Sequence, residues 1–136
     1  MEHIFEKPLY KISRVGLVIL LLSVAWGCLQ APGPDDTPWF LGADKVIHLS
    51  SYALLYISAW LAFPGALLSW TLHGALLAYG LLIEGLQSLT DYRSAELADM
   101  LANATGLGLG CLFLSLLAGR LAFIHQYRAA YERQKS

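Results

Sequence analysis

The sequence predicts an all-α protein: a four-helix transmembrane bundle that forms a single domain over residues 1–136, with both termini in the cytoplasm. Two observations lead to this prediction. Hydrophobic residues make up 57% of the 136-residue chain and charged residues only 14%, and the charges avoid four long segments. A helix rises about 1.5 Å per residue, so about 20 residues cross a hydrocarbon core of about 30 Å. The four candidate spans are residues 15–30, 46–63, 67–88 and 97–123.

The first span follows a basic stretch that contains Lys7, Lys11 and Arg14. A basic stretch before an apolar segment also resembles a signal peptide, and residues 25–28 (AWGC) resemble a lipoprotein cleavage box. The tryptophan fits such a box poorly, so we favour a retained signal anchor. Pro8 argues against one continuous helix from the first residue, because proline lacks the backbone N–H that a helix interior needs.

The second span begins with polar residues on one helix face. The preceding residues 31–43 contain three prolines and two aspartates, which predict an acidic, solvated loop. Asp44 is expected either to cap the helix or to have a direct functional role. Lys45, His48 and Tyr52 follow at spacings of three and four residues, so their side chains share a face.

The third span ends, and the fourth begins, with a second group of polar residues. Glu84 and Gln87 share a face near the end of the third span, and the turn after it contains Arg93. Ionisable residues in membrane helices are costly unless they are paired or face an interior or water-filled cavity, so they indicate a functional site. The fourth span begins with polar residues three and four apart: Glu96, Asp99 and Asn103.

Small residues recur every four positions in the fourth span, at Ala102, Gly106 and Gly110. Such a stripe lets a neighbouring helix approach closely, and that helix belongs either to this chain or to a partner protein. The tail from residue 120 to residue 136 is polar and basic. We expect it to extend the fourth helix into water.

Seven of the nine basic residues lie near the two ends of the chain, and only Lys45 and Arg93 lie between the spans. The positive-inside rule therefore places both termini in the cytoplasm. In this orientation residues 31–43 and 89–95 face outward, and the polar residues of the last three spans lie at one level near the outer surface. We expect the following residues to form a ligand-binding site: Lys45, His48, Tyr52, Glu84, Gln87, Arg93, Asp99 and Asn103.

Over residues 44–110 the chain resembles the VanZ-like family of small multi-pass membrane proteins. No single element of the motif is specific to the family, but the ordered set of elements across three spans is specific to it. The namesake of the family is associated with resistance to the glycopeptide teicoplanin. The resemblance implies a cell-envelope protein at the outer face of the cytoplasmic membrane, which contributes to teicoplanin tolerance. The position of Glu84, about one turn from the end of its span, also suits the binding of a lipid head group, a lipid-linked envelope precursor or a glycopeptide with an acyl tail. The matching elements are Asp44-Lys45 with His48 and Tyr52, Glu84 with Gln87, Arg93-Ser94, and Asp99 with Asn103 and Gly106.

Two interpretations of the polar residues remain open. In a structural latch, Lys45 and Arg93 neutralise Glu84 and Asp99, because buried ions are costly unless they are paired. In an outward-facing pocket, Arg93 and Lys45 hold a phosphate or carboxylate group. The candidate catalytic residues in such a pocket are Glu84, His48 and Asp99, since desolvation moves a carboxyl pKa towards the range that a general base needs.

Several other functional classes are not indicated. The sequence has no nucleophile motif, phosphate-binding glycine loop or dinucleotide fingerprint, so no cofactor is expected and a binding protein is favoured over an enzyme. No basic stripe indicates nucleic acid binding. A metal held by His48, Glu84 and Asp99 is a third possibility, but no close metal-binding sequence motif supports it, so no metal is predicted. The expected partners are the lipid bilayer and a lipid-linked envelope precursor or glycopeptide. In the alternative, the chain is a non-catalytic subunit or assembly factor of a larger membrane complex.

Overall fold

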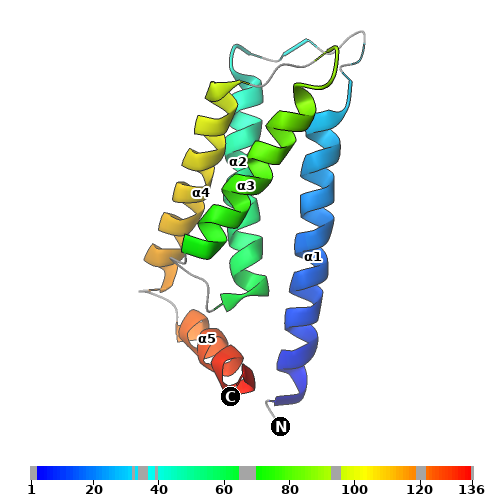
Figure 1. The fold of residues 1–136 in the computed structure, drawn as a ribbon. Coiled ribbons are helices and arrows are strands. Elements are labelled where there is room, and N and C mark those ends of the chain that lie inside the picture. Colours follow the sequence, from blue (N-terminus) through cyan, green and yellow to red (C-terminus); the bar gives the residue numbers. More distant parts are fainter. Residues whose placement is uncertain are drawn as a thin grey trace.

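The computed structural model describes residues 3–31, 33, 37–38, 40–64, 70–92, 96–118 and 122–135, and in these residues it contains five α-helices and no strand (Figure 1). The all-α prediction is therefore confirmed, whereas the number of helices is five instead of four. The helices are α1 (His3–Leu29), α2 (Ala43–Ala62), α3 (Trp70–Gln87), α4 (Leu97–Ala118) and α5 (Ala122–Lys135).

The four longer helices run along the length of the molecule, and α5 lies at one end, beside the start of α1 (Figure 1). α2 packs more extensively against α4 and α1 than α3 does against either of them. The core therefore lies around α2. Its largest side chains are at most 2% exposed: Tyr52, Leu55, Tyr56 and Trp60.

The close approach of α2 and α4 depends on two glycines of the small-residue stripe. A Cβ atom at Gly106 would collide with the backbone oxygen of Leu49. A Cβ atom at Gly110 would lie 2.8 Å from the backbone oxygen of Ala53, which is closer than a side chain tolerates. The stripe therefore packs against a helix of the same chain, one of the two possibilities that the sequence left open.

The starts of α1 and α2 differ from the sequence-based expectations. α1 begins at His3 and continues through Pro8, where a break was expected. Pro8 is the sixth residue of this helix, beyond its first turn, so it leaves the backbone oxygen of Ile4 without its usual helical donor. α2 begins at Ala43, and its N-cap is Gly42, whose φ of 85° is in the left-handed region that glycine adopts readily. Asp44 is therefore not the cap but a first-turn residue, where its charge still suits the helix dipole.

The C-terminal tail was expected to extend the fourth helix, but it forms a separate helix, α5, which packs against the rest of the molecule while most of its described side chains stay exposed. The hydroxyl of Tyr10 in α1 donates to the backbone oxygen of Tyr127 in α5 at 3.0 Å, and the two rings lie 5.0 Å apart. The hydroxyl of Tyr127 donates in turn to the backbone oxygen of Leu61, at the end of α2, at 3.1 Å. Buried aromatic rings thus hold α5 against two other helices.

Two helices in the described part of the chain are long and apolar enough to cross a membrane, judged by length and composition: Tyr10–Leu29 of α1 and Leu97–Ala118 of α4. This agrees with two of the four expected spans. The other two expected spans, residues 46–63 and 67–88, correspond to α2 and α3, which do not reach the same hydropathy. Polar residues lower it in each helix: Asp44, Lys45 and His48 in α2, and His73, Glu84 and Gln87 in α3.

Candidate functional site

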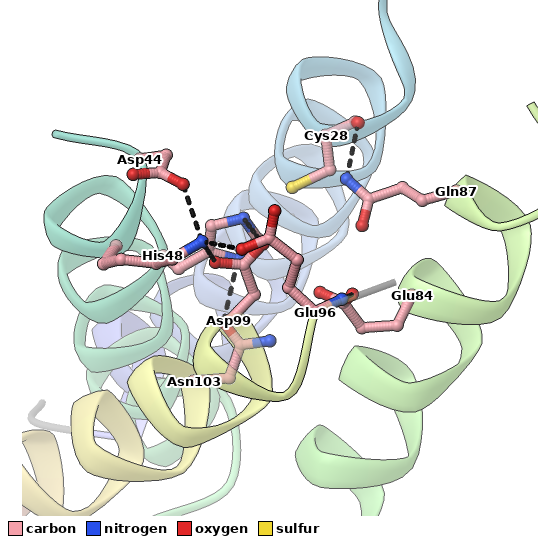
Figure 2. Close-up of polar contacts among 9 residues, drawn as sticks. Cys28, Asp44, His48, Glu84, Gln87, Glu96, Asp99 and Asn103 are labelled. Atoms are coloured by element: carbon pink, nitrogen blue, oxygen red, sulfur yellow. Dashed lines mark hydrogen bonds and ion pairs between the residues drawn. The ribbon is translucent and has the colours of Figure 1, made fainter. Parts of the chain in front are cut away.

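Buried polar residues gather where the start of α2, the end of α3 and the start of α4 meet (Figure 2). Among the residues described, five polar or charged ones are buried, with exposures between 1% and 6%. All five belong to the site expected from the sequence: His48, Glu84, Gln87, Asp99 and Asn103. We use the term polar cluster for Lys45, His48, Glu84, Asp99 and Asn103.

Lys45 lies at the exposed edge of the polar cluster and forms three ion pairs. Its Nζ atom lies 2.7 Å from Asp44 Oδ2, 2.6 Å from Glu96 Oε2 and 2.5 Å from Asp99 Oδ1. Lys45 donates hydrogen bonds to Asp44 and Glu96, whereas the contact with Asp99 Oδ1 is an ion pair, and that buried oxygen has no hydrogen-bond partner among the described residues. Desolvation lowers the pKa of Lys45, but the interactions with Asp44, Asp99 and Glu96 outweigh it and raise the pKa above its ordinary value. The hydrogen bond from Lys45 also lowers the pKa of Asp44.

His48 connects α2 to α4 through both ring nitrogens. Its Nδ1 atom lies 3.0 Å from the amide oxygen of Asn103, and its Nε2 atom lies 3.7 Å from Asp99 Oδ2. An amide oxygen only accepts hydrogen bonds, so with Asn103 in this orientation Nδ1 is the protonated nitrogen. In the neutral ring Nε2, on the side of Asp99, then has the free lone pair.

Glu84 extends from α3 towards His48 and Asp99 (Figure 2). Its Oε2 atom accepts a hydrogen bond from the backbone N–H of Glu96 at 3.1 Å, at the N-terminus of α4. A carboxylate is favoured there by the positive end of the helix dipole. Its Oε1 atom is buried and has no hydrogen-bond partner among the described residues. Capping of α4 therefore accounts for the burial of Glu84 Oε2, but it does not account for the burial of Oε1.

Two further site residues expected from the sequence lie beside the polar cluster. Gln87 does not bond to it: its Nε2 atom donates to the backbone oxygen of Cys28 at 2.8 Å and joins α3 to α1 (Figure 2). Tyr52 is 1% exposed, and its hydroxyl lies in a space that Gly80 leaves open. A Cβ atom at Gly80 would lie only 2.9 Å from that hydroxyl and 3.2 Å from Asn103 Nδ2.

Arg93, the residue expected to contact an anion, lies outside the described residues, as does Ser94. Conversely, the structure places two residues at the site that the sequence did not single out as members. Glu96 pairs with Lys45, and its position three residues before Asp99 was a usable signal. Gly80 had no such signal, because only the packing of α3 against α2 and α4 gives it a role.

A crevice between α3 and α4 reaches the polar cluster. It has a volume of about 160 Å³ and is lined by Leu77, Gly80, Leu81, Met100 and Asn103. Asn103 belongs both to this crevice and to the polar cluster. Leu77 and Leu81, which face the crevice from α3, are 39% and 54% exposed. An apolar surface thus leads from the outside of the bundle to a buried amide.

Two groups of side chains present potential metal ligands. His48, Glu84 and Asp99 each offer one ligand atom, and these atoms all lie within 4.8 Å of one another. Asp44, Glu96 and Asp99 form a second group with the same spacing. The ammonium of Lys45 lies among the carboxylates of the second group. The sequence did not predict a metal at the first group, because no close metal-binding sequence motif supports one.

No model of a known protein family matches the chain, and no similar curated protein or solved structure was found. The resemblance to the VanZ-like family therefore stays a prediction from the motif residues.

Proposed function

We propose that the chain is a multi-pass protein of the cytoplasmic membrane, in which α1 to α4 all cross the bilayer and both termini are cytoplasmic. The distribution of apolar surface supports this. Side chains more than half exposed form one face of α1, and others lie on α4, while buried polar groups gather inside the bundle. Contiguous exposed apolar surface of this kind marks a membrane or protein contact. The residues are Ile12, Val15, Ile19, Leu22 and Trp26 in α1, and Leu101, Leu112, Phe113 and Leu116 in α4.

Reporter fusions test this arrangement. Fusions after Gln30, Pro64, Ser94 and the C-terminus are expected to report outside, inside, outside and inside, because four spans return the chain to the side on which it started. The measurement is the activity of a reporter that works only in the cytoplasm, paired with one that works only outside. A C-terminus outside the cytoplasm would contradict the four-span arrangement.

At the outer end of this bundle, the polar cluster is proposed to bind the head group of an amphiphilic envelope ligand. The supporting observation is the crevice between α3 and α4, which leads from exposed leucines to Asn103 and the cluster. A ligand with an acyl or isoprenyl tail fits this geometry, because its tail contacts apolar side chains while its head group reaches polar ones. The class includes lipid-linked envelope precursors and acylated glycopeptides such as teicoplanin.

Binding is favoured over catalysis, and a role as a subunit of a larger complex has lost one of its supports. Gly106 and Gly110 were candidates for contact with a partner protein, but α2 of the same chain covers both. The latch interpretation explains Lys45, whose ion pairs are complete. It does not explain the unpartnered Oε1 atom of Glu84. The ligand interpretation gives that oxygen a role.

The proposed function is tested by comparing cells with and without the gene for their susceptibility to glycopeptides. Loss of the chain is expected to increase susceptibility to teicoplanin several-fold, because teicoplanin, a glycopeptide with an acyl tail, belongs to the proposed class of ligands. A glycopeptide without an acyl tail is the control and should show a smaller change. Equal susceptibility of the two strains to teicoplanin would argue against a role in tolerance.

A further inference from the structure

We propose that His48, Glu84 and Asp99 bind a divalent metal ion of the zinc class. The three side chains come from α2, α3 and α4, so the ion would join three helices at one point (Figure 2). Each is 3% to 6% exposed, and the ligand atoms that they offer lie within 4.8 Å of one another. Imidazole and carboxylate together are ligands that zinc accepts in proteins.

The internal contacts of the cluster leave one buried oxygen of Glu84 and one of Asp99 without a hydrogen-bond partner among the described residues. Lys45 donates hydrogen bonds to Asp44 and Glu96 and forms an ion pair with Asp99 Oδ1, which has no hydrogen-bond partner among the described residues. The other oxygen of Asp99, Oδ2, faces His48 Nε2 at 3.7 Å, which is too long for a hydrogen bond. Glu84 Oε1 has no hydrogen-bond partner among the described residues although the side chain is almost fully buried. A buried group of this kind is costly unless a further partner satisfies it.

The separation of His48 from Asp99 and the orientation of the His48 ring suit a metal ion. Ligand atoms at about 2.0–2.1 Å from tetrahedral zinc lie about 3.3 Å from one another, so the 3.7 Å between His48 Nε2 and Asp99 Oδ2 needs only a small side-chain adjustment. Histidines that bind metals donate their other ring N–H to an oxygen acceptor, which fixes the ring. His48 has this arrangement, because its Nδ1 atom faces the amide oxygen of Asn103 at 3.0 Å.

The ligand set also indicates which ions are preferred and what the ion does. An imidazole nitrogen favours zinc over magnesium and calcium, which prefer oxygen ligands alone. Three protein ligands leave the fourth tetrahedral position for an exogenous group, as in zinc sites that bind water or substrate. A phosphate oxygen of a lipid head group suits that position. This last step rests on the proposed function, whereas the metal site itself does not.

The site is tested by titrating the metal alone into the purified full chain in detergent, prepared without a polyhistidine tag and treated with a chelator. Zn²⁺ is measured by calorimetry and elemental analysis, and Co²⁺ by its absorption spectrum, which reports nitrogen ligation and tetrahedral geometry. One ion per chain is expected, with no comparable binding of Mg²⁺ or Ca²⁺. Glu84→Gln, Asp99→Asn and His48→Gln are each expected to weaken binding by at least about 100-fold.

One further variant tests the orientation of the His48 ring, and a second serves as a control. Asn103→Leu is expected to weaken binding by about 10- to 100-fold, because it removes the acceptor that orients His48. It should also change the Co²⁺ spectrum, which a loss of stability alone would not do. Asp91→Asn is the matched control: Asp91 is exposed in the turn after α3, and affinity should stay within about threefold.

Two results would overturn the metal site. One is the absence of stoichiometric Zn²⁺ and Co²⁺ binding by the folded wild-type chain, which needs no variant to be interpretable. The other is loss of binding in Glu96→Gln together with retained binding in Glu84→Gln, because the ion would then occupy the group of Asp44, Glu96 and Asp99. No lipid is present in this titration, so its failure leaves the head-group proposal to be judged by the susceptibility assay.

Discussion

Gly106→Ala is expected to destabilise the bundle by about 2 kcal/mol or more, although the same change stabilises most helices. Alanine is favoured over glycine in a helix interior by about 1 kcal/mol. At Gly106 the added Cβ atom would collide with the backbone oxygen of Leu49, so α2 and α4 must move apart. Overpacking of this kind costs roughly 1–3 kcal/mol and sometimes more, and here backbone rather than a flexible side chain is in the way. Unfolding in detergent, followed by circular dichroism, measures the effect.

Gly108→Ala is the matched control for this prediction. Gly108 lies in the same helix, two residues away, and a Cβ atom there would meet nothing within 4 Å. Its replacement should stabilise the protein by up to about 1 kcal/mol, through helix propensity alone. Gly110→Ala should destabilise the protein, as Gly106→Ala does. Equal stability of Gly106→Ala and Gly108→Ala would contradict the close packing of α2 against α4.

Lys45→Gln is expected to cost about 2 kcal/mol of stability at neutral pH. Removing one partner of a buried ion pair costs about 3–5 kcal/mol, because it leaves an uncompensated charge. The expected loss is smaller here, since the Lys45 side chain is 29% exposed and water screens its interactions. Among the three carboxylates, Asp99 loses the most stabilisation, because its side chain is only 9% exposed and its charge is left buried without a cation. Lys135→Gln, at an exposed position in α5, is the control and should be close to neutral.

The pH dependence of Lys45→Gln follows from the two pKa shifts. The pKa of Lys45 is raised in the folded state, so its contribution is fully present at neutral pH and is lost only as the pH rises through that raised value. The pKa of Asp44 is lowered, so its contribution is present above about pH 4 and is lost as the pH falls through its folded value. The difference in stability between wild type and Lys45→Gln should therefore be larger at pH 7 than below pH 4. A constant difference would contradict an electrostatic origin.

The sequence predicted the polar cluster because most of its geometry is local to single helices. Residues three and four apart share a helix face, which placed Lys45 with His48 and Asp99 with Asn103. The alternation of spans then placed the start of α2, the end of α3 and the start of α4 at one end of the bundle. The structure brings these residues together as expected, with distances of 3.0 Å between His48 and Asn103 and 2.5 Å between Lys45 and Asp99.

What the sequence did not predict depends on contacts between helices. The role of Gly80 exists only because Tyr52 and Asn103 come from two other helices. Gln87 shares a face with Glu84, yet its amide bonds to α1, because the rotation of α3 directs it there. The packing of α5 depends on the contact between Tyr127 and Tyr10, which lie near opposite ends of the chain. No local sequence pattern indicates such a contact.

The most direct measurement compares Glu84→Gln with wild type for both folding and glycopeptide tolerance. Glutamine keeps an oxygen that accepts a hydrogen bond from the backbone N–H of Glu96. The free energy of unfolding should therefore change by no more than about 1 kcal/mol. Tolerance to teicoplanin should nevertheless fall to the level of cells without the gene, because the carboxylate that faces His48 and Asp99 is lost. Asp91→Asn, an acid-to-amide change in the turn after α3, should alter neither property. A site for a ligand predicts this separation of folding from function. Strong destabilisation of Glu84→Gln, with tolerance that follows only the amount of folded protein, would instead identify the polar cluster as a structural latch.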